Sequence, residues 1–139
     1  MAEKKPRAAR ARGGRAARGA RILLVEDSPT YRELATLLLE AGGHTVIEAP
    51  TAEEGLRLAR AAPPDMIVMD TNLPGMDGFG AVRELKRDAR TRHIPVVGLT
   101  ADRIWDEEQR ERARAAGFDQ YAEKPVDREA FRELLRPFL

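Results

Sequence analysis

The stretch Met66-Ile67-Val68-Met69-Asp70 indicates the fold class, because it is a continuous apolar run that ends in a carboxylate. Such a run is typical of a strand buried on both faces of a parallel sheet. A second run of this kind, Ile22 to Val25, is followed by Glu26 and Asp27. Strands with two buried faces need helices above and below the sheet. The two runs therefore predict an α/β fold.

Apolar runs alternate with amphipathic segments along the rest of the chain, and no internal repeat is present. Three more strands are expected at residues 44–49, 94–99 and 118–122. Helices are expected at residues 79–87 and 103–116, and two further helices should begin after the N-cap residues Thr51 and Asp127. Ser28 and Pro29 begin another helix. Its apolar positions are Leu34, Leu37, Leu38 and Ala41. Because parallel strands need right-handed crossover connections, the alternation predicts a doubly wound, five-stranded parallel sheet.

Polar side chains stand at the ends of four predicted strands. They are Glu26 and Asp27 after the first strand, Asp70 after the third, Thr100 after the fourth and Lys124 after the fifth. The carboxyl ends of parallel strands lie at one edge of the sheet, where ligands of doubly wound folds bind. We therefore expect these five side chains to form one site.

The chemistry of these side chains indicates phosphoryl transfer. Three converging carboxylates repel one another and need a cation, and oxygen ligands without Cys or His favour Mg²⁺, with Mn²⁺ as a second possibility. Since Mg²⁺ takes few protein carboxylates, one carboxylate is left to act as a nucleophile. A lysine, a hydroxyl and a metal ion neutralise the charge on the transferred oxygens.

With these motifs in place, residues 21–139 closely resemble the receiver domain of bacterial two-component response regulators. The resemblance rests on the acidic pair after ILLV, the IVMD stretch, the NLPGMDG loop at residues 72–78, Thr100-Ala101 after VVGL, and Lys124-Pro125. The family implies a flavodoxin-like (βα)5 fold with strand order 2-1-3-4-5.

The resemblance also implies a role for each site residue. Asp70 is expected to be the phosphoacceptor, with Glu26, Asp27, Asp70 and the backbone carbonyl of Asn72 as magnesium ligands. Thr100 and Lys124 are expected to contact the phosphoryl oxygens. The family's switch couples Thr100 to an aromatic residue on the fifth strand, here Tyr121, and changes the surface made by the fourth helix, fifth strand and fifth helix.

A receiver that ends after its last helix is expected to act through other proteins. The resemblance implies a single-domain response regulator that takes phosphate from a histidine kinase or a histidine phosphotransfer protein, and then binds a downstream protein or serves a phosphorelay. Its only catalysis is self-catalysed phosphorylation and dephosphorylation of Asp70, so it is not a metabolic enzyme.

Two other functions remain open from the sequence. One is a receiver-like scaffold that binds partners without phosphorylation. The other is a metal-dependent phosphatase of the aspartyl-phosphate type, which normally has a second acid two residues after the nucleophile, where this chain has Asn72. A nucleotide or flavin binder is disfavoured because no glycine-rich phosphate loop follows the first strand.

Charge is distributed unevenly along the chain. Residues 1–21 carry eight Lys or Arg and one Glu, a net charge of +7, whereas the remaining residues carry 16 basic and 22 acidic side chains, a net charge of −6. We expect residues 1–20 to form a disordered Ala/Arg/Gly tail, with the domain at residues 21–139. We expect this tail to be a solvated leader without a specific partner, and nucleic-acid binding is not expected elsewhere in the chain. The tail nevertheless has the charge to contact nucleic acid, an acidic membrane surface or an acidic protein.

Composition also bears on the compartment. The chain has no cysteine, which excludes disulfides and thiolate metal sites. No apolar run reaches the roughly 18 residues of a membrane span, and the Arg-rich N-terminus lacks the apolar stretch of a secretory signal. We expect a cytoplasmic protein without a membrane span.

Overall fold

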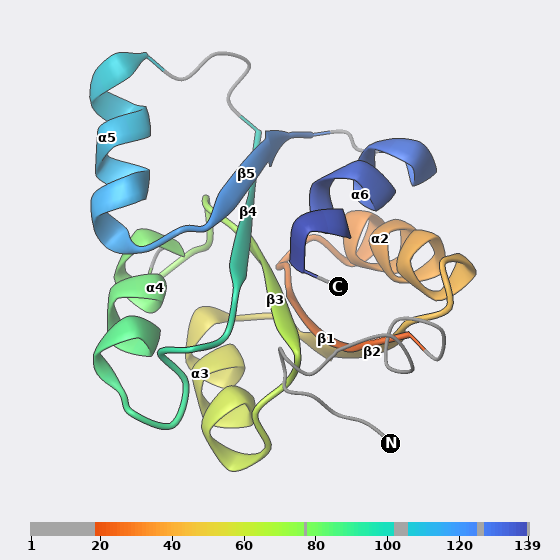
Figure 1. The fold of residues 1–139 in the computed structure, drawn as a ribbon, viewed down its shortest axis with the longest axis horizontal. Helices are drawn as coiled ribbons and strands as arrows, with labels where there is room; N and C mark the ends of the chain where they lie inside the picture. Colours follow the sequence, from red (N-terminus) through yellow and green to blue (C-terminus); the bar gives the residue numbers. More distant parts are fainter. Residues whose placement is uncertain (1–18, 77, 102–105, 125–126, 139) are drawn as a thin grey trace.

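The computed structural model describes residues 19–76, 78–101, 106–124 and 127–138. In this part of the chain five parallel strands form one sheet in the order β2-β1-β3-β4-β5, which confirms the predicted fold and strand order (Figure 1). The strands are β1 (Arg21–Val25), β2 (Thr45–Ala49), β3 (Met66–Asp70), β4 (Val96–Thr100) and β5 (Gln120–Glu123). The α-helices are α2 (Pro29–Ala41), α3 (Ala52–Ala61), α4 (Gly78–Arg87), α5 (Glu107–Ala116) and α6 (Arg128–Leu135), and a 3₁₀ turn, Arg136–Phe138, follows.

Helices cover both faces of the sheet. Figure 1 shows α2 and α6 side by side on one face, with α3, α4 and α5 on the other. Every residue of β3 and β4 is buried, as expected for central strands with two covered faces, whereas the edge strands β2 and β5 are only partly buried. The apolar runs that indicated the fold are therefore the centre of the sheet.

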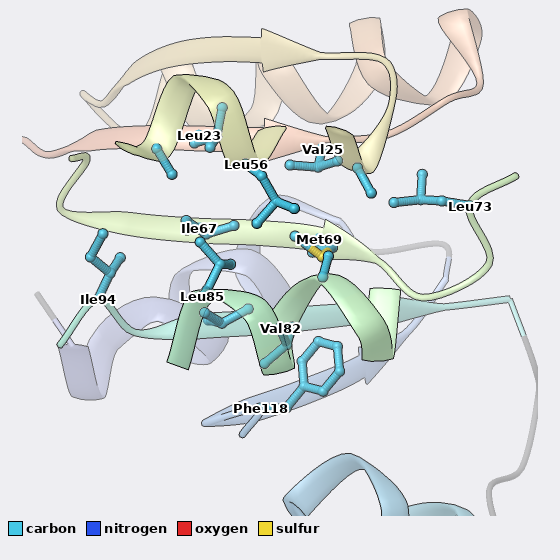
Figure 2. Packing of buried hydrophobic residues seen from close by; sticks show 14 of the residues in the cluster. Leu23, Val25, Leu56, Ile67, Met69, Leu73, Val82, Leu85, Ile94 and Phe118 are labelled. Carbon is cyan, nitrogen blue, oxygen red and sulfur yellow. The ribbon is translucent and has the colours of Figure 1, made fainter. Parts of the chain in front are cut away.

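Two apolar cores lie on opposite faces of the sheet. The first packs β1, β3 and β4 against α3 and α4, and Figure 2 shows Leu56 on one side of Met69 and Val82 with Leu85 on the other. The second core joins the opposite face of the same strands to α2 and α6, with Ala35, Leu39, Phe131 and Leu135 as the helical contributions. Because side chains alternate along each strand, one strand supplies both cores.

Side-chain caps begin four of the helices. Ser28, Thr51, Asp106 and Asp127 have extended backbones and accept a hydrogen bond from the backbone N–H three residues later. Each such cap contributes about 1 kcal/mol. The predicted caps Ser28, Thr51 and Asp127 are thus confirmed, and each places the first turn of its helix at the carboxyl edge of the sheet.

The predicted start of helix α5, Arg103, lies outside the described residues, because residues 102–105 are not among them. Asp106 has the extended backbone of an N-cap, with φ −77° and ψ 179°. Its side chain and that of Gln109 form a reciprocal capping box. The helix therefore begins at Glu107. The polar composition of this segment gave no periodicity from which to place that start.

The expected apolar face of α2 also needs correction. Ala35 and Leu39 are buried against the sheet, whereas Leu34 and Leu37 are 44% and 59% exposed. The small side chain of Ala35 lets the helix approach the sheet closely, so the buried stripe runs through positions 35 and 39. Two leucines assigned to the core are therefore on the surface.

Smaller differences concern strand ends. Strand β2 begins at Thr45 rather than His44, β4 at Val96 rather than Ile94, and β5 spans Gln120–Glu123. Shifts of one or two residues are usual at element boundaries. Phe118, expected to begin β5, instead follows Gly117, whose φ of 115° turns the chain so that Phe118 enters the first core.

The predicted tail lies almost wholly outside the described residues, which begin at Gly19. Ala20 is only 4% exposed, and its backbone N–H donates to His44 Nδ1 at 3.1 Å, so the ordered packing extends to this residue. Within the described part of the chain, no helix has the length and apolar character to span a bilayer.

Candidate functional site

The predicted site residues meet where the order of the sheet reverses. Chain connections run in opposite directions from β1 and β3, which are hydrogen-bonded neighbours. Glu26 and Asp27 follow β1, and Asp70 ends β3, so all three side chains lie at the carboxyl edge of this switch point. Doubly wound folds bind ligands in this place.

The three carboxylates are close enough to share a cation. One oxygen from each of Glu26, Asp27 and Asp70 lies within 4.8 Å of the others. Glu26 is 1% exposed and Asp70 is 3% exposed, whereas Asp27 faces solvent. The site therefore has two buried acids and one acid at its mouth.

Lys124 is the cation that faces this cluster. Its Nζ lies 2.8 Å from Glu26 Oε1 and 3.4 Å from Asp70 Oδ2, and its side chain is 17% exposed. The strand pairing explains this position, because the backbone N–H of Lys124 donates to Thr100 O at 2.8 Å and so carries the lysine past the end of β4. The β5 end thus faces the ends of β1 and β3.

Burial and neighbouring charges have opposing effects on the pKa values of Glu26 and Lys124. Burial raises the pKa of Glu26 above its usual range, and the Lys124 ammonium and Ser28 amide offset only part of the rise, while Asp70 adds to it by repulsion. Burial alone would lower the pKa of Lys124, but Glu26 and Asp70 outweigh it, and the net pKa is raised. Lys124 is therefore charged at neutral pH.

Backbone N–H groups orient the two buried acids. Ser28 N–H donates to Glu26 Oε2 at 3.1 Å, and Asn72 N–H donates to Asp70 Oδ1 at 3.0 Å. Arg32 adds a bond from its Nη1 to the backbone oxygen of Glu26 at 2.8 Å. Each acid is thus held by the loop that follows its own strand, which leaves the remaining carboxylate oxygens directed at Lys124.

Thr100 and Tyr121 occupy different parts of the same neighbourhood. Thr100 is 4% exposed at the end of β4, beside β3, where Leu99 pairs with Asp70. Tyr121 pairs with Gly98, two residues earlier in β4, and packs as a half-buried side chain against the first core. The structure brings Thr100 to the carboxyl edge and places Tyr121 below it, toward α5.

Three contributors to the site were not identified from the sequence. The ring of Tyr31 lies 4.5 Å from Lys124 Nζ, measured to its centroid. Arg32 holds the Glu26 backbone, and Gly78 packs against Asp70. The available signal was that Tyr31 and Arg32 fall in the first turn after Ser28, next to the acidic pair.

The donor set suits a hard divalent cation. Three carboxylates and one ammonium have a net charge of −2, which one such ion neutralises, and carboxylate oxygens are preferred ligands of Mg²⁺ and Mn²⁺. Glu26 and Asp70 are buried, so their mutual repulsion is weakly screened. The residues present therefore fit the metal ion that the sequence suggested.

Comparisons with known proteins agree with this geometry. A model of the family described as the response regulator receiver domain matches residues 22–136. Protein PilH of Pseudomonas aeruginosa is 39% identical over 125 residues, covering 86% of this chain and 98% of PilH. The polar-differentiation response regulator DivK of Brucella ovis is 36% identical over 118 residues, covering 85% of this chain and 94% of DivK.

Solved structures show the same fold. The chemotaxis protein CheY4 of Vibrio cholerae superposes with a TM-score of 0.81 at 28% identity, covering 87% of this chain and 99% of CheY4. The receiver domain of the sensor histidine kinase PA1611 of Pseudomonas aeruginosa has a TM-score of 0.78 at 32% identity, covering 86% and 97%, and was crystallised with a magnesium ion coordinated in its active site cleft. The chain belongs to the response regulator receiver domain family.

Proposed function

We propose that this receiver is a phosphorylation switch in which Asp70 accepts a phosphoryl group from a histidine kinase or a histidine phosphotransfer protein. The observation that carries the proposal is the position of the Asp70 carboxylate. It is 3% exposed, 3.4 Å from the Lys124 ammonium, and within 4.8 Å of the carboxylates of Glu26 and Asp27. A nucleophilic oxygen, a cation and a metal-binding pair thus share one small site.

The residues that would hold Mg²⁺ are Glu26, Asp27, Asp70 and the backbone carbonyl of Asn72, and Mn²⁺ suits the same oxygens. When bound, the ion neutralises negative charge on the transferred phosphoryl oxygens. The chain supplies the other requirements. The Asn72 N–H fixes the rotation of the Asp70 carboxylate. Glu26 is buried, so water does not screen the charge of its carboxylate.

The proposed transfer is a displacement at phosphorus. One Asp70 oxygen forms the new P–O bond as the P–N bond to the donor's histidine breaks, and the imidazole leaves with the electron pair of that bond. In this proposal, Lys124 and the Thr100 hydroxyl contact the phosphoryl oxygens. Dephosphorylation is attack of water on the same phosphorus, which restores the carboxylate and releases inorganic phosphate.

The proposed output surface is formed by α5, β5 and α6, which would bind a downstream protein or serve a phosphorelay. Thr100 at the end of β4 and Tyr121 on the adjacent strand are the proposed couple that relays phosphorylation to this surface. Helix α5 contributes only Ala113 and Ala116 to the buried residues, so few contacts hold it in place. A weakly anchored helix shifts at a small cost in free energy.

We further propose that the phosphodonor docks on α2. This helix begins beside Glu26 and exposes two leucines, Leu34 at 44% and Leu37 at 59%. They are the large apolar side chains that the described part of the chain leaves exposed. A donor that presents an apolar helical surface would cover them while its histidine reaches Asp70.

The test is intact mass after incubation with acetyl phosphate, with and without Mg²⁺. We expect a Mg²⁺-dependent phosphoryl adduct on the wild-type protein and none on Asp70→Asn. The matched control is Asp88→Asn, which changes the aspartate that follows α4 and should leave the adduct intact. A folded wild-type protein that gives no adduct would overturn the proposal and favour a phosphorylation-independent scaffold.

A further inference from the structure

The Lys124 ammonium has an aromatic neighbour besides its two carboxylates. The ring of Tyr31, in the first turn of α2, lies 4.5 Å from Lys124 Nζ, within the range of a cation–π contact. The same ammonium is 2.8 Å from Glu26 Oε1 and 3.4 Å from Asp70 Oδ2. The ammonium of Lys124, the residue that follows β5, is thus contacted by α2, by the last residue of β3 and by the residue that follows β1.

A closed chain of contacts sets the position of the ring. Ser28 Oγ accepts a hydrogen bond from the Tyr31 backbone N–H at 3.2 Å, and Ser28 N–H donates to Glu26 Oε2 at 3.1 Å. The other oxygen of Glu26 pairs with Lys124, whose ammonium contacts the Tyr31 ring. The helix cap that begins α2 therefore also places the ring beside the lysine.

The two carboxylates alone do not determine where the ammonium stays. It is closer to Glu26 than to Asp70, and a lysine side chain has several rotatable bonds, so its ammonium can take many positions. An aromatic face attracts the ammonium but carries no formal charge, so the ring does not neutralise the lysine's positive charge. The ring therefore restricts the lysine while leaving its charge available to phosphoryl oxygens.

We propose that Tyr31 is a positioning residue that holds the Lys124 ammonium within reach of Asp70, an inference that rests on the proposed phosphorylation of Asp70 for its functional consequence. The ring itself touches no reacting atom. It acts by keeping the lysine between Glu26 and Asp70, so that the cation is already in place when a phosphodonor arrives.

The structural part is tested by NMR, without any phosphodonor. Protons over an aromatic face are shifted upfield, so the ε-methylene protons of Lys124 should resonate upfield of those of Lys86, whose ammonium contacts the backbone oxygen of Ile94 and the carboxylate of Asp119. Tyr31→Phe should retain this shift and Tyr31→Leu should abolish it. An unshifted Lys124 in the wild-type protein would overturn the proposal.

The functional part is tested by the rate of Asp70 phosphorylation with acetyl phosphate and saturating Mg²⁺. The Tyr31→Leu variant should react about three- to fivefold more slowly than wild type. The Tyr31→Phe variant should react at the wild-type rate, because only the ring is required. Circular dichroism and urea unfolding establish that both variants fold. If Leu and Phe variants react equally fast, Tyr31 has only a packing role against the second core and the proposal is wrong.

The two readouts separate this inference from the proposed function. If wild type shows the shifted lysine signal but forms no phosphoryl adduct, the proposed function fails and the position of Lys124 over Tyr31 is still established. If the adduct forms at the same rate in all three proteins, the proposed function holds and the positioning role of Tyr31 is lost.

Discussion

Gly78 packs so closely against the end of β3 that a Cβ atom there would lie 2.7 Å from the backbone oxygen of Asp70. It would also lie 2.9 Å from Thr71 Cα, and neither backbone atom can move without moving the site. The loop after Asp70 returns at this glycine to begin α4. Its lack of a side chain is therefore a condition for the position of the Asp70 carboxylate.

We predict that Gly78→Ala impairs the site more than the fold. The added methyl group should cost about 1–3 kcal/mol in unfolding free energy through overpacking. Because a displacement of about 1 Å is enough to misalign a reacting group, phosphorylation by acetyl phosphate should slow by about 10- to 100-fold. Time courses of intact mass and urea unfolding measure the two effects. Gly42→Ala is the control, since its nearest contact would be an ordinary 3.4 Å.

Asp70→Asn should stabilise the protein in the absence of Mg²⁺. Three carboxylates face one ammonium, and Asp70 raises the pKa of Glu26 by repulsion, so removing one charge relieves strain worth about 1 kcal/mol. Added Mg²⁺ should stabilise wild type, by about 2.7 kcal/mol at 100 times its dissociation constant, and stabilise Asp70→Asn much less. Urea midpoints with and without Mg²⁺ report both effects.

The same titration has a direct control and a contradicting outcome. Asp88→Asn removes a carboxylate that pairs with Arg60 and Arg90, away from the cluster, and should keep the wild-type response to Mg²⁺. If Asp70→Asn were less stable than wild type without Mg²⁺ and equally stabilised by it, the acidic cluster would be neither strained nor the binding site for the ion.

The acidic site was predictable because parallel topology brings every strand end to one edge. Once the strands were assigned, their order in the sequence was enough to place four side chains together: Glu26, Asp27, Asp70 and Lys124. Tyr31 was not predictable in this way, since its contact with Lys124 joins a helix to a distant strand end, and neither periodicity nor motif spacing encodes such a contact.

The outward leucines of α2 show a second limit of sequence reasoning. Leu34 and Leu37 share the helical spacing of core residues, and Ala35 and Leu39 offer an equally regular stripe. Periodicity detects an amphipathic helix but does not choose between two adjoining apolar stripes. The choice depends on how closely the helix approaches the sheet, which is a property of tertiary packing.

Gly98→Ala should destabilise the protein through Phe118. An added Cβ would lie 2.8 Å from a ring carbon of Phe118, which is 7% exposed and packs edge-on against Phe79 with a centroid distance of 5.6 Å. We expect a loss of about 1–2 kcal/mol, because the ring is a side chain that can rotate partly away. The double variant Gly98→Ala, Phe118→Leu should lose less unfolding free energy than the sum of the losses in the two single variants. Additive losses in a urea double-mutant cycle would show that the two positions do not interact.

Replacing both exposed leucines of α2 by serine should separate protein donors from small-molecule donors. Leu34→Ser with Leu37→Ser removes apolar surface that is 44% and 59% exposed, so stability should change little. The donor for this test is the phosphorylated protein that transfers phosphate fastest to wild type. Its transfer rate to the double variant should fall at least tenfold, whereas the rate with acetyl phosphate should not change. Ala61→Ser, on exposed α3 surface, is the control. Equal loss with both donors would place the defect in the site rather than in docking.

The stability of the protein should fall as His44 becomes protonated. Burial lowers the pKa of His44 from 6.5, and its Nδ1 accepts a hydrogen bond from the Ala20 N–H at 3.1 Å, so the folded state favours the neutral ring. The unfolded state then binds more protons below pH 6.5, and unfolding free energy therefore decreases as pH falls from about 7 to 5.5. The loss is limited to about 1.4 kcal/mol per pH unit, because the imidazole takes up one proton. It should stay below this limit, since the ring is only half-buried and solvent screens its charge. Urea unfolding of wild type and His44→Asn, which keeps an acceptor but does not titrate, measures the difference. If His44→Asn shows the same slope between these pH values, other groups cause the loss.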